Sequence, residues 1–372
     1  MYRETKDPLA TSALFITAEF LPAFAAPALT ARLDQLPLRR VLGALYVGEA
    51  VCFGLLALLA SSFSLPLVLA LALIDGILML TARGLSRGAV NAVLRPAGEL
   101  RAGNGLLNIG LAISSVGGAA LGGLLVDRLG VGSALAVDAA SFLAIAVLMG
   151  TCRHLPGEHR DREPFLARLR SGLSHARRDP VTRLLLGGEA LAVMLFALIV
   201  PIEIVYAQET LGTNDAGYGI LLSAWGAGVV LGSVAFISLK RRSPWLLIAI
   251  STLAIGVAYL GMATTRQLAV ACAFSVLGGF GNGIQWVSVM TALQEATPDD
   301  LQARITGLLE SIASAMTGVG FLIGGIVTAV WSPPTAFAVS GFGVIAIVAV
   351  GFVAWLAPGR QRRLTAASGG HD

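Results

Sequence analysis

Charged residues, cysteines and histidines are all scarce in this sequence. Only 13% of its 372 residues are charged, about half of the share typical of soluble domains. The three cysteines (Cys52, Cys152 and Cys272) are too few and too scattered for a disulfide framework or a metal cluster. None of the four histidines has ligand spacing within an apolar segment. These shortages exclude a soluble globular domain, a disordered chain and a nucleic-acid binder, and we expect no metal or other cofactor.

Long apolar segments make up most of the chain, with 56% hydrophobic residues and a mean hydropathy of +0.79. A membrane-spanning helix needs about 20 mainly apolar residues. Without an alternating strand pattern, the sequence predicts an all-α polytopic membrane protein. Eleven segments qualify as spans: 9–29, 41–60, 65–82, 104–125, 133–150, 184–207, 217–238, 244–263, 268–292, 302–329 and 334–357.

The 26 lysines and arginines are distributed unevenly over the connecting segments. Alternate loops and the C-terminal tail hold almost all of them, while Arg3, Lys6, Arg128 and Arg266 fall in the remaining loops. Cytoplasmic loops are enriched in these residues. We therefore expect a multi-pass protein with a cytoplasmic C-terminus. Little lysine beside abundant arginine and alanine is typical of a high-GC bacterial source, which predicts the bacterial inner membrane.

A long arginine-rich segment, 151–183, separates two apolar halves. Phe165, Leu166, Leu169 and Leu173 recur at helical spacing within it, which is typical of an amphipathic helix on the inner leaflet. It predicts an N-terminal half at 1–150, a C-terminal half at 184–357 and a tail at 358–372. The halves share motifs at one constant offset, typical of parallel transporter repeats: Gly105-Leu106-Leu107 with Gly307-Leu308-Leu309, Gly118 with Gly320, Gly122-Gly123 with Gly324-Gly325, and Arg39-Arg40 with Arg241-Arg242.

Two short motifs resemble those of a known superfamily. Residues 33–42 read LDQLPLRRVL, which resembles the cytoplasmic signature loop of the major facilitator superfamily and keeps Asp34, Arg39 and Arg40. The span 104–125 resembles the antiporter signature, with Ala119 where proline is usual. Stretches 137–143 and 278–304 resemble the transmembrane secretion effector branch, which includes macrolide-efflux and enterobactin-export proteins.

This resemblance implies a twelve-helix fold. The five spans of the first half would be helices 2–6 and the six of the second half helices 7–12, so the chain is expected to lack the first helix. It also implies that the signature loop, through Asp34, Arg39 and Arg40, acts together with Arg87 as a cytoplasmic gate between the halves. Ordinary positive-inside topology would explain the arginines alone.

Acidic residues within the spans are candidates for proton coupling, because a charge at the bilayer centre costs roughly 2.5–3.5 kcal/mol on insertion scales. Asp75 lies halfway along its helix, on one stripe with Met79, Arg83 and Arg87. By the resemblance, this helix lines the central cavity. Such a carboxylate can exchange a proton, or it can serve only as part of an internal ion pair or as a hydrogen-bond partner in helix packing.

Further acids fall in other spans. Glu19 lies mid-span near Pro22, while Glu189 and Glu203 flank one helix and share a face with Phe196. Pro201 favours a kink in that helix, and Glu203 could reach only the outer interface. Glu49 and Asp138 are expected to hold structure. We therefore rank Asp75, Glu19, Glu203 and Glu189 as proton-coupling candidates.

Polar residues within 268–292 are candidates for a substrate cavity. Ser275, Asn282, Gln285 and Trp286 are expected to share one helix face, with Phe196 added from the span 184–207. Such a stripe can bind a bulky amphipathic ligand or join two helices. The glycines expected to pack helices closely are Gly118, Gly122, Gly123, Gly320 and Gly324.

Together these features predict a secondary transporter and no enzyme. The leading hypothesis is proton-antiport export of small amphipathic molecules, of drug, macrolide or siderophore type, by alternating access. Its partners would be the small-molecule substrate, protons and membrane lipid, with no nucleic acid, and the protein would be a monomer. An uptake or uniport carrier, or a non-transporting scaffold or truncated remnant, remains the alternative.

Overall fold

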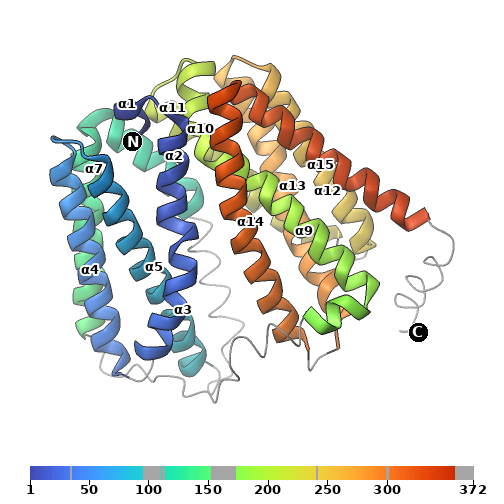
Figure 1. The fold of residues 1–372 in the computed structure, drawn as a ribbon, viewed down its shortest axis with the longest axis horizontal. Coiled ribbons are helices and arrows are strands. Elements are labelled where there is room, and N and C mark those ends of the chain that lie inside the picture. Colours follow the sequence, from blue (N-terminus) through green and yellow to red (C-terminus); the bar gives the residue numbers. More distant parts are fainter. Residues whose placement is uncertain are drawn as a thin grey trace. The chain divides into compact units, whose positions relative to one another are not determined.

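The computed structural model describes residues 1–33, 36–94, 110, 114–151, 173–239, 242–298 and 301–356. Its elements in these ranges are helical throughout (Figure 1). Ten helices there are long and apolar enough to cross a membrane. α7 (Ala119–Thr151) overlaps two of the predicted spans, 104–125 and 133–150, and its backbone leaves the helical conformation at Gly130, where φ is 82° and ψ is 165°. This break separates what the sequence predicts as two spans.

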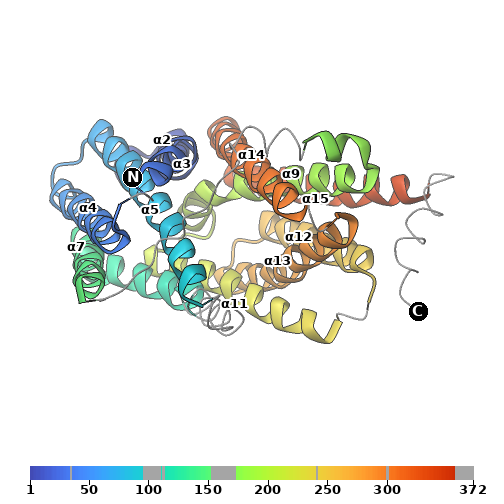
Figure 2. The same ribbon diagram turned by 90° about the horizontal axis from the view of Figure 1, so that it is seen from below.

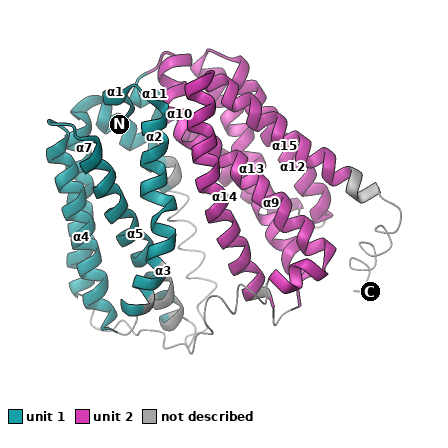
Figure 3. Cartoon of the chain, in the orientation of Figure 1, with its two compact units in different colours: residues 1–161, 214–219 teal, residues 162–213, 220–372 magenta. Residues whose placement is uncertain are grey.

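The chain forms two compact units (Figure 3). Unit 1 contains residues 1–161 together with 214–219, and unit 2 contains 162–213 and 220–372. The helices of unit 1 are α1 (Tyr2–Thr5), α2 (Pro8–Phe15), α3 (Pro22–Leu33), α4 (Leu38–Leu59), α5 (Leu65–Leu94) and α7, with π-helical segments η1 (Ile16–Phe20) and η2 (Ser114–Gly118).

The first long helix of unit 1 is interrupted in its middle. Asp7 caps its start, because the Asp7 carboxylate accepts a hydrogen bond from the Leu9 amide at 2.8 Å and Pro8 occupies the first turn. Pro22 has no amide hydrogen to donate to the Ala18 carbonyl, and the preceding residues adopt the π-helical segment η1. Gly76 of α5 packs on this point, against the Ala18 carbonyl and Pro22.

Three helices of unit 1 lie side by side: α4 contacts both α5 and α7 (Figures 1 and 2). On α7, the Phe142 ring lies 5.2 Å from the Phe53 ring and 6.5 Å from the Tyr46 ring of α4, measured between centroids. Towards the start of α4, the core of α4 and α5 consists of Leu38, Val41, Leu42, Leu45, Ala82 and Leu85. This packing fixes the register of α4 against its neighbours.

Unit 2 contains the remaining helices. The span after residue 180 is divided into α9 (Pro180–Ile199), a 3-10 turn η3 (Val200–Ile202), α10 (Glu203–Val205) and a π-helical segment η4 (Tyr206–Thr210). Pro201 lies in the 3-10 turn and explains why the regular α-helix ends there. The others are α11 (Asp215–Leu239, whose first turn belongs to unit 1), α12 (Pro244–Thr264), α13 (Leu268–Ala296), α14 (Gln302–Val330) and α15 (Pro333–Leu356).

Aromatic rings and one tyrosine hydroxyl hold the core of unit 2 together. The Tyr259 ring is 5.8 Å from Trp225 and 6.0 Å from Phe337, and Phe337 also meets Tyr206 at 4.6 Å. The Tyr206 hydroxyl donates to the Met262 carbonyl at 2.7 Å. These contacts tie η4, α11, α12 and α15 into one core.

Candidate functional site

Asp75 lies on α5, half-buried, and its Oδ1 has no hydrogen-bond partner among the described residues. Two other carboxylates interact with it electrostatically, Glu49 of α4 and Asp138 of α7. Glu49 is buried and Asp138 is exposed. The structure thus brings together three acids that the sequence places in three separate spans.

Arg83 interacts with different acids from the one that its position in the sequence suggests. It lies two turns after Asp75 on α5, and its side chain is exposed. Its electrostatic partners include Glu19 of η1 and Glu49 of α4. Glu19 is itself exposed, in the irregular segment that Gly76 approaches. The arginine therefore interacts with two acids on other elements, Glu19 and Glu49.

Glu189 and Gln285 form a buried hydrogen bond in unit 2. The Gln285 Nε2 of α13 donates to the Glu189 Oε2 of α9 at 2.6 Å, and each side chain is 5% exposed. A carboxylate held by an amide keeps lone pairs that can accept a proton or a ligand donor. A proton-coupling candidate, Glu189, and a substrate-cavity candidate, Gln285, are thus joined by one hydrogen bond.

Glu203 is buried, at 9% exposure, and it interacts electrostatically with Tyr259 of α12. The Tyr259 hydroxyl is buried and has no hydrogen-bond partner in the described chain. Tyr259 is not among the residues that the sequence singles out, although a phenol within the mainly apolar span 244–263 is an available signal. The turn at Val200–Ile202 also interrupts the helical periodicity on which the shared face of Glu189 and Glu203 was predicted.

The predicted polar face of α13 divides into buried and exposed residues. Ser275 is fully buried and donates to the Leu221 carbonyl at 3.1 Å, so its hydroxyl joins α13 to α11. Asn282 is half-buried, whereas Trp286 is 46% exposed. Phe196 is also exposed, and its ring lies 5.7 Å from Trp225. Trp286 and Phe196 are the candidates with large exposed apolar surface.

The glycine candidates differ in their surroundings. Gly320 lies against the Met194 carbonyl and Gly324 against the Leu198 carbonyl, so α14 contacts the backbone of α9. Gly123 of α7 lies against the Asp215 carbonyl, where an added Cβ would be 2.6 Å from the oxygen. A Cβ at Gly118 or Gly122 would have no described atom within 4 Å. In the described chain these two positions show no close helix contact.

The gate candidates fall largely at the margins of the described chain. Asp34 lies outside the described residues, as does most of the predicted amphipathic helix, including Phe165 and Leu169. Arg39 and Arg40 are exposed in the first turn of α4, and Arg87 is a residue of α5.

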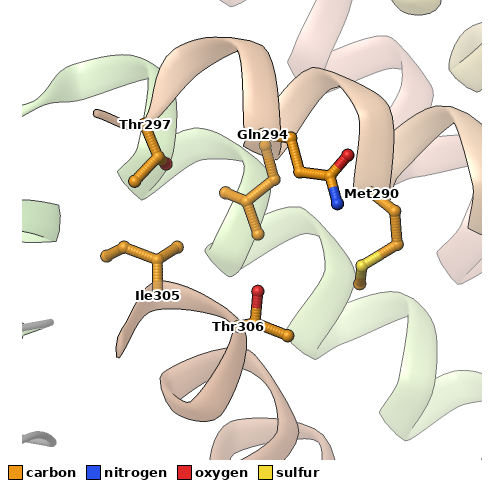
Figure 4. Close-up of a pocket in the computed structure, with 6 residues that line it drawn as sticks. Met290, Gln294, Thr297, Ile305 and Thr306 are labelled. Atoms are coloured by element: carbon orange, nitrogen blue, oxygen red, sulfur yellow. The ribbon is translucent and has the colours of Figure 1, made fainter. Parts of the chain in front are cut away.

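A small pocket between α13 and α14 is lined by Met290, Leu293, Gln294, Thr297, Ile305 and Thr306 (Figure 4). It contains no charged side chain, and its interior has no room for even a water molecule. It is therefore not a substrate site in this conformation.

Comparisons with known proteins identify the family. A family model described as a transmembrane secretion effector, of the major facilitator superfamily, matches residues 10–368. The enterobactin exporter EntS of Citrobacter koseri is 28% identical over 250 residues, which is 65% of this chain and 58% of that protein. EntS of Salmonella choleraesuis is 27% identical over 251 residues, with the same coverage. The alignments thus span 58% of the length of these curated relatives.

Solved structures show the same fold. A mutant of the nucleoside transporter NupG matches with a TM-score of 0.76 at 14% identity, over 94% of this chain and 90% of that one. A bacterial homologue of the human lysosomal transporter Spinster, in an inward-facing and unoccupied conformation, matches with a TM-score of 0.67 at 14% identity, over 91% of this chain and 86% of that one. The superfamily resemblance read from the sequence motifs is confirmed. This chain belongs to the transmembrane secretion effector family of the major facilitator superfamily, a family of multi-pass membrane transporters rather than enzymes.

Proposed function

We propose that this protein exports a small amphipathic molecule across the bacterial inner membrane by proton antiport. The observation that carries the proposal is Asp75, a half-buried carboxylate inside a membrane-spanning helix of a transporter family, with one oxygen that has no hydrogen-bond partner among the described residues. Ionisable residues at such positions are rare and often mark proton or ion pathways. Export, rather than uptake, is supported by the similarity to enterobactin exporters.

The substrate class is supported by groups in unit 2. Exposed Trp286 and Phe196 offer apolar and aromatic contact area, and the adjacent Glu189–Gln285 pair offers polar atoms. A hydrophobic surface with few polar groups suits an amphipathic compound. We propose drug-, macrolide- or siderophore-type molecules as substrates.

The proposed cycle follows alternating access in a monomer. Eleven spans, five and six, would form two parallel halves, with residues 151–183 as the linker and the C-terminus in the cytoplasm. The loop with Asp34, Arg39 and Arg40 would close the cytoplasmic side. Protonation and release at Asp75 would accompany each change of state, with Glu19, Glu189 and Glu203 as further acids on the pathway.

Asp75→Asn tests this proposal. In inverted membrane vesicles, the wild-type protein should accumulate a probe against its gradient when the lumen is acidified; the probes are ethidium, a macrolide and enterobactin. We expect Asp75→Asn to fold and to bind the probe, but to lose gradient-driven accumulation down to the level of vesicles without the protein. The amide mimics only the protonated acid.

The control is Glu310→Gln, which changes an exposed carboxylate of α14 and should transport as the wild type does. Full gradient-driven export by Asp75→Asn would contradict the role of Asp75. Wild-type transport that ignores the pH gradient would support a uniport carrier, and the absence of transport of any probe would support a scaffold.

A further inference from the structure

A second carboxyl group lies buried next to the one used in the proposed function. Glu49 of α4 is 1% exposed, and its Oε1 has no hydrogen-bond partner in the described part of the chain. Its sequence position suggests only a structural role. However, burying an ionised carboxylate without a partner is costly, and the group commonly takes up a proton instead.

The packing of α4 on α5 places Glu49 near Asp75. A Cβ added to Gly48, the residue before Glu49, would lie 2.9 Å from the Leu78 Cδ1 of α5. Leu78 is three residues after Asp75, and residues at this spacing share a helix face. Glu49 and Asp75 interact electrostatically, and each has one oxygen without a hydrogen-bond partner among the described residues.

The surroundings favour one charge on this pair rather than two. Arg83 attracts negative charge from two turns away, roughly 12 Å along α5, whereas Asp138 repels it. The described residues contain no group of three or more ligands able to hold a metal ion. Within the described ranges, the charged and titratable side chains that interact at this pair are Glu19, Glu49, Cys52, Asp75, Arg83 and Asp138.

We propose that Glu49 and Asp75 hold one exchangeable proton between them, so that the site is a carboxyl pair from α4 and α5. Two neighbouring carboxylates in apolar surroundings do not both ionise readily, and the pair titrates as a unit. Its use in transport rests on the proposed function, whereas the sharing of the proton does not. Protonation of either acid then depends on the charge of the other.

Labelling with dicyclohexylcarbodiimide tests the pair without a substrate. This reagent attacks protonated carboxyl groups in apolar surroundings, and peptide mass mapping locates the label. In the purified protein we expect label on Glu49 or on Asp75, but not on both in one chain, and this label disappears as the pH rises. In Asp75→Asn, the labelling midpoint of Glu49 should move to lower pH by about 1 unit or more, because the like charge is gone.

The reciprocal variant, Glu49→Gln, ensures that the test does not depend on Asp75→Asn alone. Glu49→Gln should shift the labelling of Asp75 in the same direction, since coupling between two sites is mutual, and Glu310→Gln should shift neither. Size-exclusion profiles and circular dichroism check that each variant is folded. Unchanged midpoints in both variants, or no label on either acid at any pH, would overturn the pair.

The outcome for the pair is distinguishable from that for transport. If the midpoints shift while export ignores the pH gradient, the pair stands and the proposed antiport fails. If export is gradient-driven but the midpoints stay in place, antiport stands and the shared proton fails.

Discussion

Several buried polar side chains of unit 2 are stabilised by partners on other helices. The Glu189–Gln285 hydrogen bond joins α9 to α13, and the Ser340 hydroxyl donates to the Leu195 carbonyl at 2.8 Å, which joins α15 to α9. Lipid provides no hydrophobic driving force between helices, so such bonds contribute directly to their association. Removing one partner leaves the other unsatisfied.

At the residue scale, Glu189→Leu should lower the free energy of unfolding by about 1–2 kcal/mol. The Gln285 amide would then be buried without its acceptor. The double variant Glu189→Leu/Gln285→Leu should regain part of this loss, because no orphaned polar group remains. Unfolding in mixed detergent micelles, followed by tryptophan fluorescence, measures both.

The exposed carboxylate of Glu310 provides the matched control, and Glu310→Leu should change the stability little. Equal stability of Glu189→Leu and the wild type would show that the hydrogen bond contributes nothing. A double variant less stable than either single variant would show that the two side chains have other roles in packing.

Candidate acids could be recognised from the sequence, but their partners could not. Asp75 and Glu189 stand out because they are charged within apolar segments. Glu189 and Gln285 are 96 positions apart, and no local pattern states which helix faces which. The sequence predicts only a structural role for Glu49, whereas its burial and its interaction with Asp75 appear only in the structure.

At the scale of elements, irregular backbone occurs beside functional candidates. Glu19 lies in the π-helical segment before Pro22, and Glu203 follows the 3-10 turn that contains Pro201. Short 3-10 and π segments within helices often accompany functional sites. In unit 1, the irregular segment is held by the close approach of Gly76.

Gly76→Ala should destabilise the protein by about 1–3 kcal/mol through overpacking. The added methyl group would collide with the Ala18 carbonyl and with Pro22. Neither can move without disturbing the π-helical segment η1. The same unfolding measurement in detergent detects the loss.

Gly54→Ala of α4 is the control, since an added Cβ there would have no described atom within 4 Å. It should keep or slightly raise stability, because alanine is the better helix former. If both variants behave alike, the packing of Gly76 on the bend does not limit stability.

Most helices follow from hydropathy, but their interruptions do not. Pro22 and Pro201 lie in or next to an irregular segment, which agrees with the loss of an amide donor. The backbone of α7 leaves the helical conformation at Gly130, between the predicted spans 104–125 and 133–150.

At the scale of the whole molecule, the arginine distribution determines the expected orientation. A reporter inserted within 155–175, or fused after Arg363, should be cytoplasmic, whereas one inserted at 209–215 should be external. Gly212 in this last segment has a left-handed φ of 61°, which marks a turn between η4 and α11. Alkaline phosphatase, active only outside, and green fluorescent protein, bright only inside, provide opposite readouts.

Matching activity of the two reporters at 155–175 and at 209–215 would contradict the predicted orientation.

The overall class and the superfamily were predictable because composition and the signature loop reflect the membrane environment and the family. The substrate was not, since apolar surfaces such as those of Trp286 and Phe196 discriminate weakly among ligands.

The glycines between α11 and α13 affect how easily these two helices can slide against each other. Gly228 and Gly232 meet the backbone of Val276 and Phe280, and Gly283 meets the Val229 carbonyl from the other side. Side chains that interlock must exchange rotamers before two helices can slide past each other. Contacts made by glycine and backbone atoms require no such exchange, so small shear displacements between α11 and α13 cost little free energy. Larger residues at Gly228, Gly232 or Gly283 would therefore hinder such displacements.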